Sequence, residues 1–192
     1  MSFNCSFGSV SRSGSLFLCG RSSLLGSGVS RVSVAGARAI DQESSLWLEQ
    51  MVDGLSSGTA VVSGLALGAD TVAFKSALAR GLPCIAVLPC GFDNITPKAN
   101  LRLARDIVKA GGLLISEYAP HTRATPATYV ARNRIIAQIG KFLIVPQFEK
   151  KSGTRHTVDF AQQEGKLIVV QNQPYSGNSF ILKNSRYKTI AK

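Results

Sequence analysis

Residues 126–154, PATYVARNRIIAQIGKFLIVPQFEKKSGT, carry the pattern that decides the fold: a helix, a buried strand and the start of a second helix. Periodic apolar residues predict a helix over 126–139, and Gly140 is expected to end it. The run Phe142–Val145 is apolar throughout, as expected for a strand inside a parallel sheet. The turn at Ser152–Thr154 then leads into another helical pattern.

The same alternation of short apolar strands and longer helical patterns extends over most of the chain. Strands are predicted at Val32–Ala35, Thr59–Ser63, Cys84–Leu88, Leu113–Ser116, Phe142–Val145 and Leu167–Val170. Helices are predicted near residues 42–56, 69–80, 97–110, 126–139 and 155–164. This order predicts the α/β class, with a doubly wound, mostly parallel sheet that helices cover on both faces.

Local signals mark several helix ends. Thr96–Pro97 and Thr125–Pro126 each predict a helix start, because a threonine N-cap is followed by proline at the first helical position. Left-handed C-terminal caps are predicted at four glycines: Gly81, Gly111, Gly140 and Gly165.

Composition limits the class of protein. The chain has 192 residues, of which 45% are hydrophobic and 18 are glycines, and this suits one globular α/β domain. The formal net charge is +11 although only 17% of the residues are charged, because acids are scarce. Such a charge favours a phosphate-rich partner or an anionic surface. No apolar run approaches the length of a membrane span, so we expect a cytoplasmic protein without a membrane partner.

Residues typical of metal and redox sites are few. The histidines are too few for a metal centre, and His156 has no nucleophile with a recognisable signature near it. We therefore predict no metal, no cofactor and no catalytic residue. The cysteines lack the paired spacing of a zinc site or a redox pair: Cys5, Cys19, Cys84 and Cys90.

Both ends of the chain differ from its centre. Residues 1–31 are rich in serine and glycine, are basic, and contain no acid, which favours a mobile tail. An organellar transit peptide is an alternative, and Leu16–Leu18 could also pack as a short strand. Residues 32–172 are the predicted folded core, and residues 173–192 a basic C-terminal tail that adds nonspecific electrostatic affinity.

Ligands of doubly wound sheets bind beyond the carboxyl ends of the strands, so the turns that follow the strands are informative. After the first strand, Gly36 permits close approach of the backbone and Arg38 is placed over a helix N-terminus. The second turn begins with Ser63 and Gly64. It is either an anion cradle or a helix start capped by Asp70, and the local sequence does not separate the two.

The third and fourth turns add charged residues. Lys98 falls in the first turn of the helix predicted from residue 97, where the macrodipole disfavours a cation unless a ligand phosphate neutralises it. Glu117 ends the fourth strand. It is either a general base or the partner that holds Arg132 or Arg134 in place, and we favour the second role.

Two segments supply donors suited to phosphate. Arg132, Asn133 and Arg134 stand at the head of an apolar helical run. At Ser152, Gly153 and Thr154, backbone N–H groups can face an anion at the start of the next helix. Two such sites in a basic chain predict a polyphosphate ligand.

Taken in order, these segments resemble the DNA-processing protein A family (DprA, also called Smf). The resemblance runs from about residue 32 to about residue 171. The matching segments are Gly36-Ala37-Arg38, Ser63-Gly64-Leu65-Ala66 with Gly68 and Asp70, Ala77-Leu78, Gly91-Phe92-Asp93, Pro97-Lys98-Ala99-Asn100, Ser116-Glu117-Tyr118, Arg132-Asn133-Arg134-Ile135-Ile136-Ala137 and Ser152-Gly153.

The resemblance implies a Rossmann-like, three-layer core domain that binds single-stranded DNA and helps to load a RecA-type recombinase. Carried over by position, Arg38 and Lys98 belong to the pocket that holds the DNA backbone. The other expected contacts are Gly36, Ser63, Gly64, Asn100, Arg132, Asn133, Arg134, Ser152, Gly153 and Thr154. A homodimer is also implied. Longer relatives carry further domains, and we expect this chain to hold the core alone.

A nucleotide-handling protein of the same superfamily is the main alternative. Phosphoribohydrolases of this architecture place a glutamate just after a Gly-Thr pair, whereas Thr157 stands at that position here. Threonine does not replace a carboxylate in general acid–base work on a glycosidic bond, so we predict that the chain is not an enzyme. A nucleotide-binding module without catalysis remains the other alternative.

Overall fold

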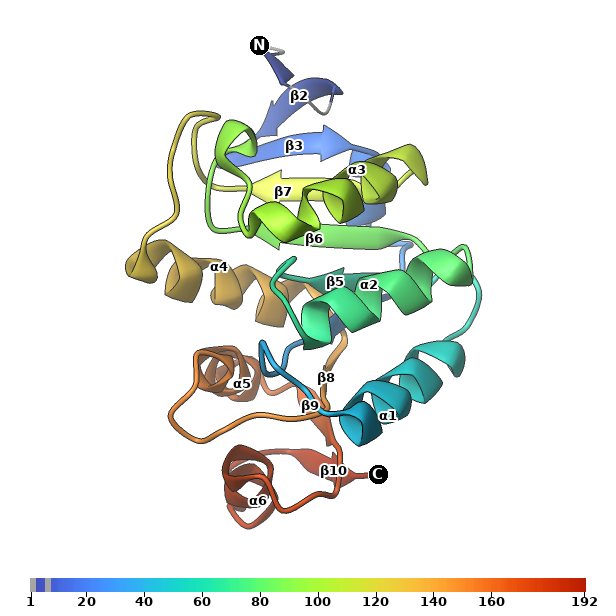
Figure 1. Cartoon of the computed structure of the whole chain (residues 1–192), viewed down its shortest axis with the longest axis vertical. Helices are drawn as coiled ribbons and strands as arrows, with labels where there is room; N and C mark the ends of the chain where they lie inside the picture. Colours follow the sequence, from blue (N-terminus) through green and yellow to red (C-terminus); the bar gives the residue numbers. More distant parts are fainter. Residues whose placement is uncertain (1–2, 6–7) are drawn as a thin grey trace.

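Seven parallel strands form the larger part of the sheet in the computed structural model, which describes residues 3–5 and 8–192 (Figure 1). They agree with the six predicted strands to within a residue at each end, and a seventh is added near the C-terminus. The strands are β4 (Arg31–Val34), β5 (Ala60–Ser63), β6 (Cys84–Leu88), β7 (Leu113–Ser116), β8 (Phe142–Val145), β9 (Leu167–Val170) and β10 (Thr189–Ala191).

The order of these strands places a switch point in the sheet. Across the sheet they are arranged as β7-β6-β5-β4-β8-β9-β10, and all neighbouring pairs are parallel. The chain therefore winds outward from β4 to β7, returns across the sheet, and continues on the other side of β4 with β8. Adjacent loops diverge where β4 lies beside β8, and this leaves a crevice at the carboxyl edge of the sheet.

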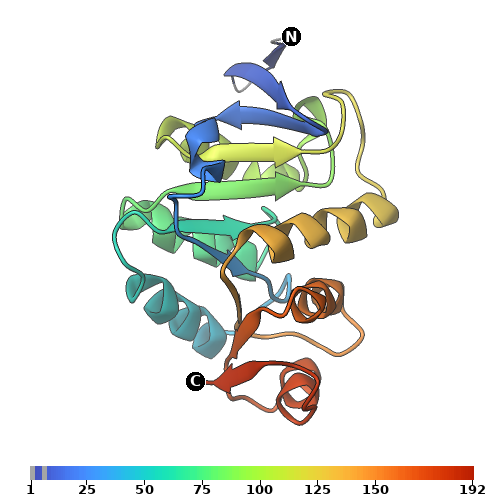
Figure 2. The same cartoon turned by 180° about the vertical axis from the view of Figure 1, so that it is seen from behind.

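The helices cover the two faces of the sheet in the order that double winding requires. The first three lie on one face: α1 (Gln42–Asp53), α2 (Ala69–Ala79) and α3 (Leu101–Lys109). The other three lie on the opposite face: α4 (Pro126–Ile139), α5 (Thr154–Gln163) and α6 (Ser176–Leu182). Figures 1 and 2 show these two groups from opposite sides. The predicted doubly wound, Rossmann-like α/β architecture is confirmed.

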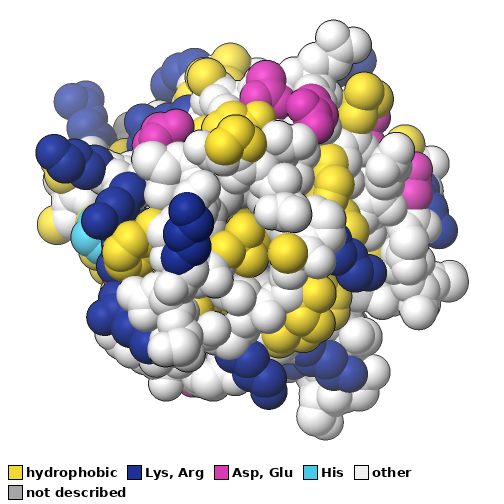
Figure 3. Space-filling view, turned by 90° about the horizontal axis from the view of Figure 1, so that it is seen from below, with side chains coloured by type: hydrophobic (Ala, Val, Ile, Leu, Met, Phe, Trp, Pro, Cys, Tyr) yellow, Lys and Arg dark blue, Asp and Glu magenta, His cyan; other side chains and the backbone are white. Residues whose placement is uncertain are grey.

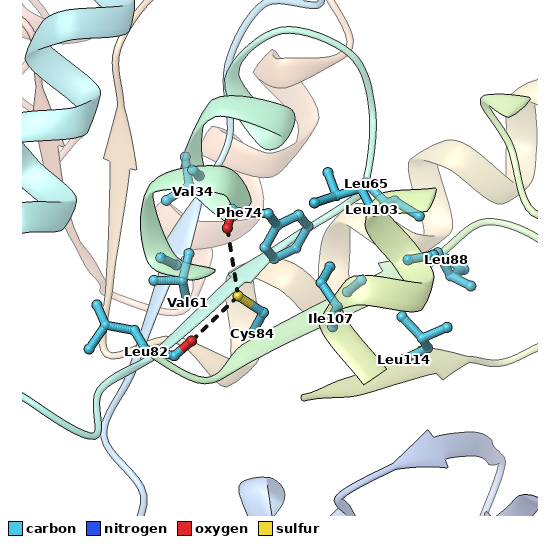
Figure 4. Close-up of a cluster of buried hydrophobic side chains, with 14 of the residues drawn as sticks. Val34, Val61, Leu65, Phe74, Leu82, Cys84, Leu88, Leu103, Ile107 and Leu114 are labelled. Atoms are coloured by element: carbon cyan, nitrogen blue, oxygen red, sulfur yellow. Dashed lines mark hydrogen bonds between the residues drawn. The ribbon is translucent and has the colours of Figure 1, made fainter. Parts of the chain in front are cut away.

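Neighbouring residues of a central strand enter different cores. Val61 packs with helices α1 to α3, whereas Val62 packs with α4, and both side chains are fully buried. In the first core Cys84 lies against Phe74, with its Sγ 3.7 Å from the carbonyl oxygen of Leu82 (Figure 4). Burial raises the pKa of this thiol to about 12. Burial on both faces explains why these strands read as continuous apolar runs.

The N-terminal segment is part of the sheet, so its interpretation as a mobile tail is wrong for residues 8–31. The strands β2 (Gly8–Ser13) and β3 (Leu16–Gly20) form an antiparallel hairpin, and β3 pairs antiparallel with β7. A short strand, β1 (Phe3–Cys5), pairs with β2, and the 3-10 helix η1 (Ser22–Leu25) follows β3. Residues 1–2 and 6–7 of this segment lie outside the described residues.

The N-terminal segment is ordered because its apolar side chains are buried against elements far away in the sequence. Val10, Leu18 and Leu24 are at most 3% exposed, because the uncovered edge of β7 and the core beneath it accept them. Serine-rich and glycine-rich composition does not reveal that the few apolar residues of this segment pack on the core once the edge of a strand is available.

The C-terminal segment is folded as well, and its interpretation as a basic tail is corrected. It forms α6 and the edge strand β10, which pairs with β9. Asn178 of α6 is fully buried, donates its Nδ2 to the carbonyl oxygens of Pro146 and Gln171 at 2.8 and 3.0 Å, and accepts from the amide of Phe148. A buried asparagine that satisfies three backbone groups of the loops after β8 and β9 cannot be recognised from local sequence.

The two threonine-proline pairs behave differently. Thr125 caps α4 with Pro126 at its first position, and Thr125 and Thr128 form a reciprocal capping box, as predicted. Pro97, in contrast, is extended, with φ −73° and ψ 152°. A 3-10 turn, η3 (Lys98–Asn100), follows it before α3 begins at Leu101. A second 3-10 turn, η2 (Phe92–Asn94), lies earlier in the same loop.

Three of the four predicted glycine caps are confirmed by positive φ angles, at Gly81, Gly111 and Gly165. Gly140 is extended instead, with φ −82° and ψ 149°. A Cβ atom at Gly140 would lie 2.2 Å from the Oγ of Ser33, so glycine is required there for the close approach of α4 to β4.

Candidate functional site

A cleft of about 480 Å³ opens at the switch point, between the carboxyl ends of β4 and β8. Its walls come from three turns that follow strands, from the middle of α4 and from the first turn of α5. The turns are residues 35–38 after β4, residues 63–70 after β5 (the β5–α2 turn) and residues 149–154 after β8 (the β8–α5 turn). Seven predicted contact residues line the cleft: Gly36, Arg38, Arg132, Asn133, Ser152, Gly153 and Thr154.

Arg132 is buried in the cleft wall, with only 5% of its surface exposed. Its Nη1 donates to the carbonyl oxygen of Val87 at 3.2 Å and lies 4.0 Å from the Oδ2 of Asp70. The guanidinium fits because Gly64 has no side chain: a Cβ atom there would lie 1.1 Å from Nη1. Burial lowers the pKa of Arg132, and the negative charge of Asp70 opposes that shift.

Tyr129 joins the buried arginine to an exposed one. Its ring lies 5.9 Å from the guanidinium carbon of Arg132 and 5.2 Å from that of Arg38. Arg38 is exposed at the mouth of the cleft. Tyr129 and Arg132 share a face of α4 because they are three residues apart. Cation–π attraction therefore holds Arg38 over the mouth of the cleft.

The β8–α5 turn presents the start of a helix to the cleft. Gly153 is the N-cap of α5, and no side chain caps this end. Thr154 donates its Oγ1 to the carbonyl oxygen of Gly36 at 2.8 Å, which ties this turn to the turn after β4. Asn133 donates its Nδ2 to the carbonyl oxygen of Gly153 at 3.3 Å. Among the described residues, the N–H groups of Arg155 and His156 donate to the carbonyl oxygens of Ser152 and Gly153, whereas those of Gly153 and Thr154 have no such partner. These two free N–H groups give this wall positive character.

The β5–α2 turn is occupied by a carboxylate of the protein itself. Asp70 accepts the backbone N–H groups of Gly64 and Ala66 at 3.1 and 3.0 Å through Oδ2. Ser63 donates its Oγ to the carbonyl oxygen of Val34 at 2.8 Å. The anion cradle is not supported, since these amides are no longer free for a ligand. The predicted capping of the helix by Asp70 is wrong as well: the N-cap of α2 is Gly68, and Asp70 closes the loop before the helix instead.

Asn100 has a similar internal role. It is 5% exposed and donates its Nδ2 to the carbonyl oxygens of Leu65 and Ala66 and to the Oγ1 of Thr71, at 2.9, 3.0 and 2.9 Å. Its amide thus holds the β5–α2 turn against η3. Ser63, Gly64 and Asn100 lie outside the cleft lining and support its walls from inside the protein.

Two predicted cations lie outside the cleft lining. Arg134 donates its Nη2 to the Oε1 of Glu117 at 2.8 Å, which confirms the pairing role expected for Glu117. Lys98 is exposed and lies in η3, one turn before α3, and this corrects its predicted place in the first turn of that helix. Burial raises the pKa of Cys90, while the positive charges of Arg132 and Lys98 act to lower it. Because η3 lies in the loop that follows the carboxyl end of β6, Lys98 lies on the same edge of the sheet as the cleft.

The sequence interpretation missed two members of the site. Tyr129 is not among the predicted contact residues, although an aromatic residue three positions before an arginine in a helix is a usable signal. Glu149 also lines the cleft, and its carboxylate accepts a hydrogen bond from the hydroxyl of Ser176 in α6. Thr157, the residue at the glutamate position of phosphoribohydrolases, is 2% exposed in the same wall.

Positive charge is not confined to the cleft. Figure 3 shows the end of the molecule that carries α6 and β10, where Lys and Arg side chains are spread widely and the acids gather near one margin. Among the described residues, no His, Cys, Asp and Glu side chains cluster as a metal site would require. No helix in the described part of the chain is long and apolar enough to span a membrane.

The chain was compared with known proteins. Residues 11–188 match the family described as DNA recombination-mediator protein A. The DNA processing protein DprA of Streptococcus pneumoniae is 38% identical over 138 residues, which cover 72% of this chain and 49% of that protein. The chain thus spans about half the length of this relative.

Two solved structures are similar over most of the fold. DNA processing protein A of Helicobacter pylori, described for its single-stranded DNA binding mode, superposes with a TM-score of 0.80 at 28% identity, covering 91% of this chain and 81% of that one. DprA of S. pneumoniae superposes with a TM-score of 0.82 at 34% identity, covering 91% and 62%.

Proposed function

This chain belongs to the DNA recombination-mediator protein A family, and from that premise we propose that it binds single-stranded DNA along the carboxyl edge of its sheet. Arg38 and Lys98 hold the phosphates in this proposal, and the cleft between β4 and β8 is part of the same surface. Contacts of this kind neutralise the phosphate backbone of DNA and do not depend on its base sequence.

One observation carries the proposal: the two cations at this edge have no acidic partner. Arg38 contacts the ring of Tyr129, and neither Arg38 nor Lys98 takes part in an ion pair among the described residues. Other arginines of the domain are neutralised internally, such as Arg134 by Glu117 and Arg155 by Asp159. An exposed cation without an internal partner is available to a phosphate.

Two parts of the proposal rest on family membership. Loading of a RecA-type recombinase and formation of a homodimer are proposed for this chain from its relatives. The absence of enzymatic activity is proposed from Thr157, because the wall of the cleft has a hydroxyl where hydrolysis of a glycosidic bond would need a carboxylate. Asp70 does not replace that carboxylate, since it is engaged by two backbone amides and faces Arg132.

Fluorescence anisotropy with labelled oligo-dT and its duplex, at several salt concentrations, tests DNA binding. We expect tight, salt-sensitive preference for the single strand. Arg38→Ala and Lys98→Ala should each weaken it roughly tenfold and reduce the salt slope by about 1. Arg21→Ala is the matched control. Arg21 is an exposed arginine directly after β3, and its amide donates to the carbonyl oxygen of Gly112, just before β7. It therefore lies at the amino edge of the parallel strands, away from the proposed DNA surface.

The control should bind the oligonucleotide within about twofold of the unsubstituted protein. If Arg38→Ala and Lys98→Ala bind as the control does, the proposed DNA surface is wrong. Equal affinity for single strand and duplex would exclude the proposed preference and favour a nucleotide-binding module.

A further inference from the structure

Arg132 has hydrogen-bonding capacity that the protein does not use. Its Nε is buried without a partner, and no hydrogen bond among the described residues involves its Nη2. Only Nη1 is engaged, by the carbonyl oxygen of Val87. The N–H groups of Nε and Nη2 are parallel, and this edge of a guanidinium is the one that binds two oxygens of a phosphate or carboxylate.

A second set of donors lies in the same cleft. No side chain among the described residues caps the N-terminus of α5, because its N-cap is Gly153; the hydroxyl of Thr154 donates instead to the carbonyl oxygen of Gly36. The Oγ of Ser152, just before this helix, is also buried without a partner. Buried polar atoms are normally satisfied, so unused donors on two elements that line one cleft indicate an anionic ligand.

The shape of the cleft limits the kind of anion. Arg132 is almost fully buried in its wall, whereas Arg38 is exposed at its mouth. The hydrogen bond between Thr154 and Gly36 joins two of its walls. A phosphodiester inside a strand continues in two directions and needs a groove open at both ends. A terminal phosphate is attached on one side only, and a volume of about 480 Å³ suits one nucleotide.

We infer that the cleft binds a phosphomonoester, the terminal phosphate of a nucleotide, between the Nε–Nη2 edge of Arg132 and the N-terminus of α5. The inference rests on the proposed function, because it places the end of a nucleic acid, or a free nucleoside monophosphate, in the cleft beside the DNA-binding cations. A phosphomonoester carries nearly two negative charges at neutral pH, against one for a diester.

The charges around the cleft agree with this ligand. The negative charge of Asp70 offsets the positive charge of Arg132. Glu149 adds a carboxylate at the exposed rim of the cleft, where it accepts a hydrogen bond from the hydroxyl of Ser176. Arg38 and the positive end of α5 remain without an acidic partner among the described residues. These two meet the phosphate from the mouth and from the β8–α5 turn, while Arg132 supplies the paired donors.

The substitution Gly153→Asp tests the inference without threatening the fold. A Cβ atom at Gly153 meets no atom within 4 Å, its φ of −61° suits any residue, and an acid at a helix N-terminus is favourable, so α5 should keep its stability. Its carboxylate would occupy the anion position. Gly28→Asp is the matched control: it also has open space, introduces the same charge, and lies in the loop before β4, at the amino edge of the sheet.

Binding of thymidine 5′-monophosphate and of thymidine should be measured by calorimetry and by the amide NMR shifts of Gly153 and Thr154. We expect the monophosphate alone to bind and to shift these amides. Gly153→Asp should weaken it at least about tenfold and Gly28→Asp less than about twofold. Equal responses to the two ligands, unmoved amides, or equal losses in both variants would overturn the inference.

Comparing oligo-dT that carries a 5′-phosphate with oligo-dT that carries a 5′-hydroxyl shows whether the phosphomonoester comes from a DNA end or from a free nucleotide. A preference for the phosphorylated strand that Gly153→Asp abolishes assigns the site to DNA ends. Equal affinities, with the monophosphate still bound, assign it to free nucleotides. If both strands bind but the monophosphate does not, this inference fails alone. If neither strand binds, the proposed DNA-binding function fails.

Discussion

The β5–α2 turn and the β8–α5 turn are similar in sequence, but their backbone N–H groups have different hydrogen-bond partners. Each contains serine and glycine, follows an apolar strand and leads into a helix. In the first, Asp70 accepts the amides of Gly64 and Ala66, and Asn100 covers the loop. In the second, no side chain caps α5 and the turn lines the cleft.

The difference shows that a glycine-bearing turn after a strand is not by itself an anion site. An internal carboxylate in the same position makes the turn structural, because its N–H groups are already paired with a negative charge. The β5–α2 turn should therefore govern stability, and the β8–α5 turn should govern ligand affinity. Substitutions in matched pairs, one in each turn, test this separation.

The largest effect is expected for Asp70→Ala. It leaves the buried amide of Gly64, the partly buried amide of Ala66 and the guanidinium of Arg132 without their carboxylate, and breaking a buried pair from one side costs about 3–5 kcal/mol. Its counterpart, Glu149→Ala, removes an exposed acid and should cost under about 0.5 kcal/mol while tightening phosphate binding. Urea unfolding measures both, and comparable losses would refute the proposed division.

Gly64→Ala should cost about 3 kcal/mol, because its Cβ would lie 1.1 Å from the Nη1 of Arg132 and would force the buried guanidinium out of place. Gly153→Ala has open space at the same point of the other turn, and we expect a change below about 0.5 kcal/mol. Thermal unfolding of the two variants provides the comparison. A mild Gly64→Ala variant would mean that Arg132 is not confined as described.

Asn100→Ala comes next, at about 2 kcal/mol, since it removes the contacts of the buried amide and leaves the carbonyl oxygen of Leu65 unpaired, while that of Ala66 keeps the hydroxyl of Thr71. Asn133→Ala removes one bond of 3.3 Å to Gly153 at an exposed site and should cost less than about 0.5 kcal/mol. Chemical denaturation distinguishes them. Similar values would show that both turns are supported equally.

The smallest expected effect is on the pH dependence of stability, through a hydrogen bond that lies behind the β8–α5 turn. This turn contacts Ser176 at the start of α6, and the neighbouring Tyr175 donates a hydrogen bond to Asp41 at the start of α1. That bond, followed by the one from the amide of Ser44, lowers the pKa of Asp41 below its usual value of 3.8. The stabilisation is present above about pH 3.8 and is lost as the pH falls through the lowered pKa.

Tyr175→Phe should therefore be less stable than the unsubstituted protein near pH 6, by under about 1 kcal/mol because Asp41 is exposed, and the difference should shrink below pH 3.8. Urea unfolding at several pH values measures it. A difference that is constant with pH would show that the hydroxyl acts independently of the Asp41 charge.

Much of the parallel sheet and its helices could be predicted from the sequence. Strands such as Cys84–Leu88 are buried on both faces and therefore read as short apolar runs, and the start at Thr125–Pro126 carries its own capping signal. The hairpin β2–β3 escaped prediction because its burial depends on the free edge of β7, about a hundred residues later in the chain.

The candidate site divides in the same way. The sequence by itself determined that Arg38 and the β8–α5 turn would lie at the same edge of the sheet, because the carboxyl ends of parallel strands share one edge. That the two meet depends on the pairing of β4 with β8, which the tertiary structure decided. Only the tertiary structure decided which of the two turns, β5–α2 or β8–α5, keeps N–H groups free for a ligand. Asp70, Asn100 and Arg132 come from three separate elements, and their meeting in space determines which N–H groups are paired and which remain for a ligand.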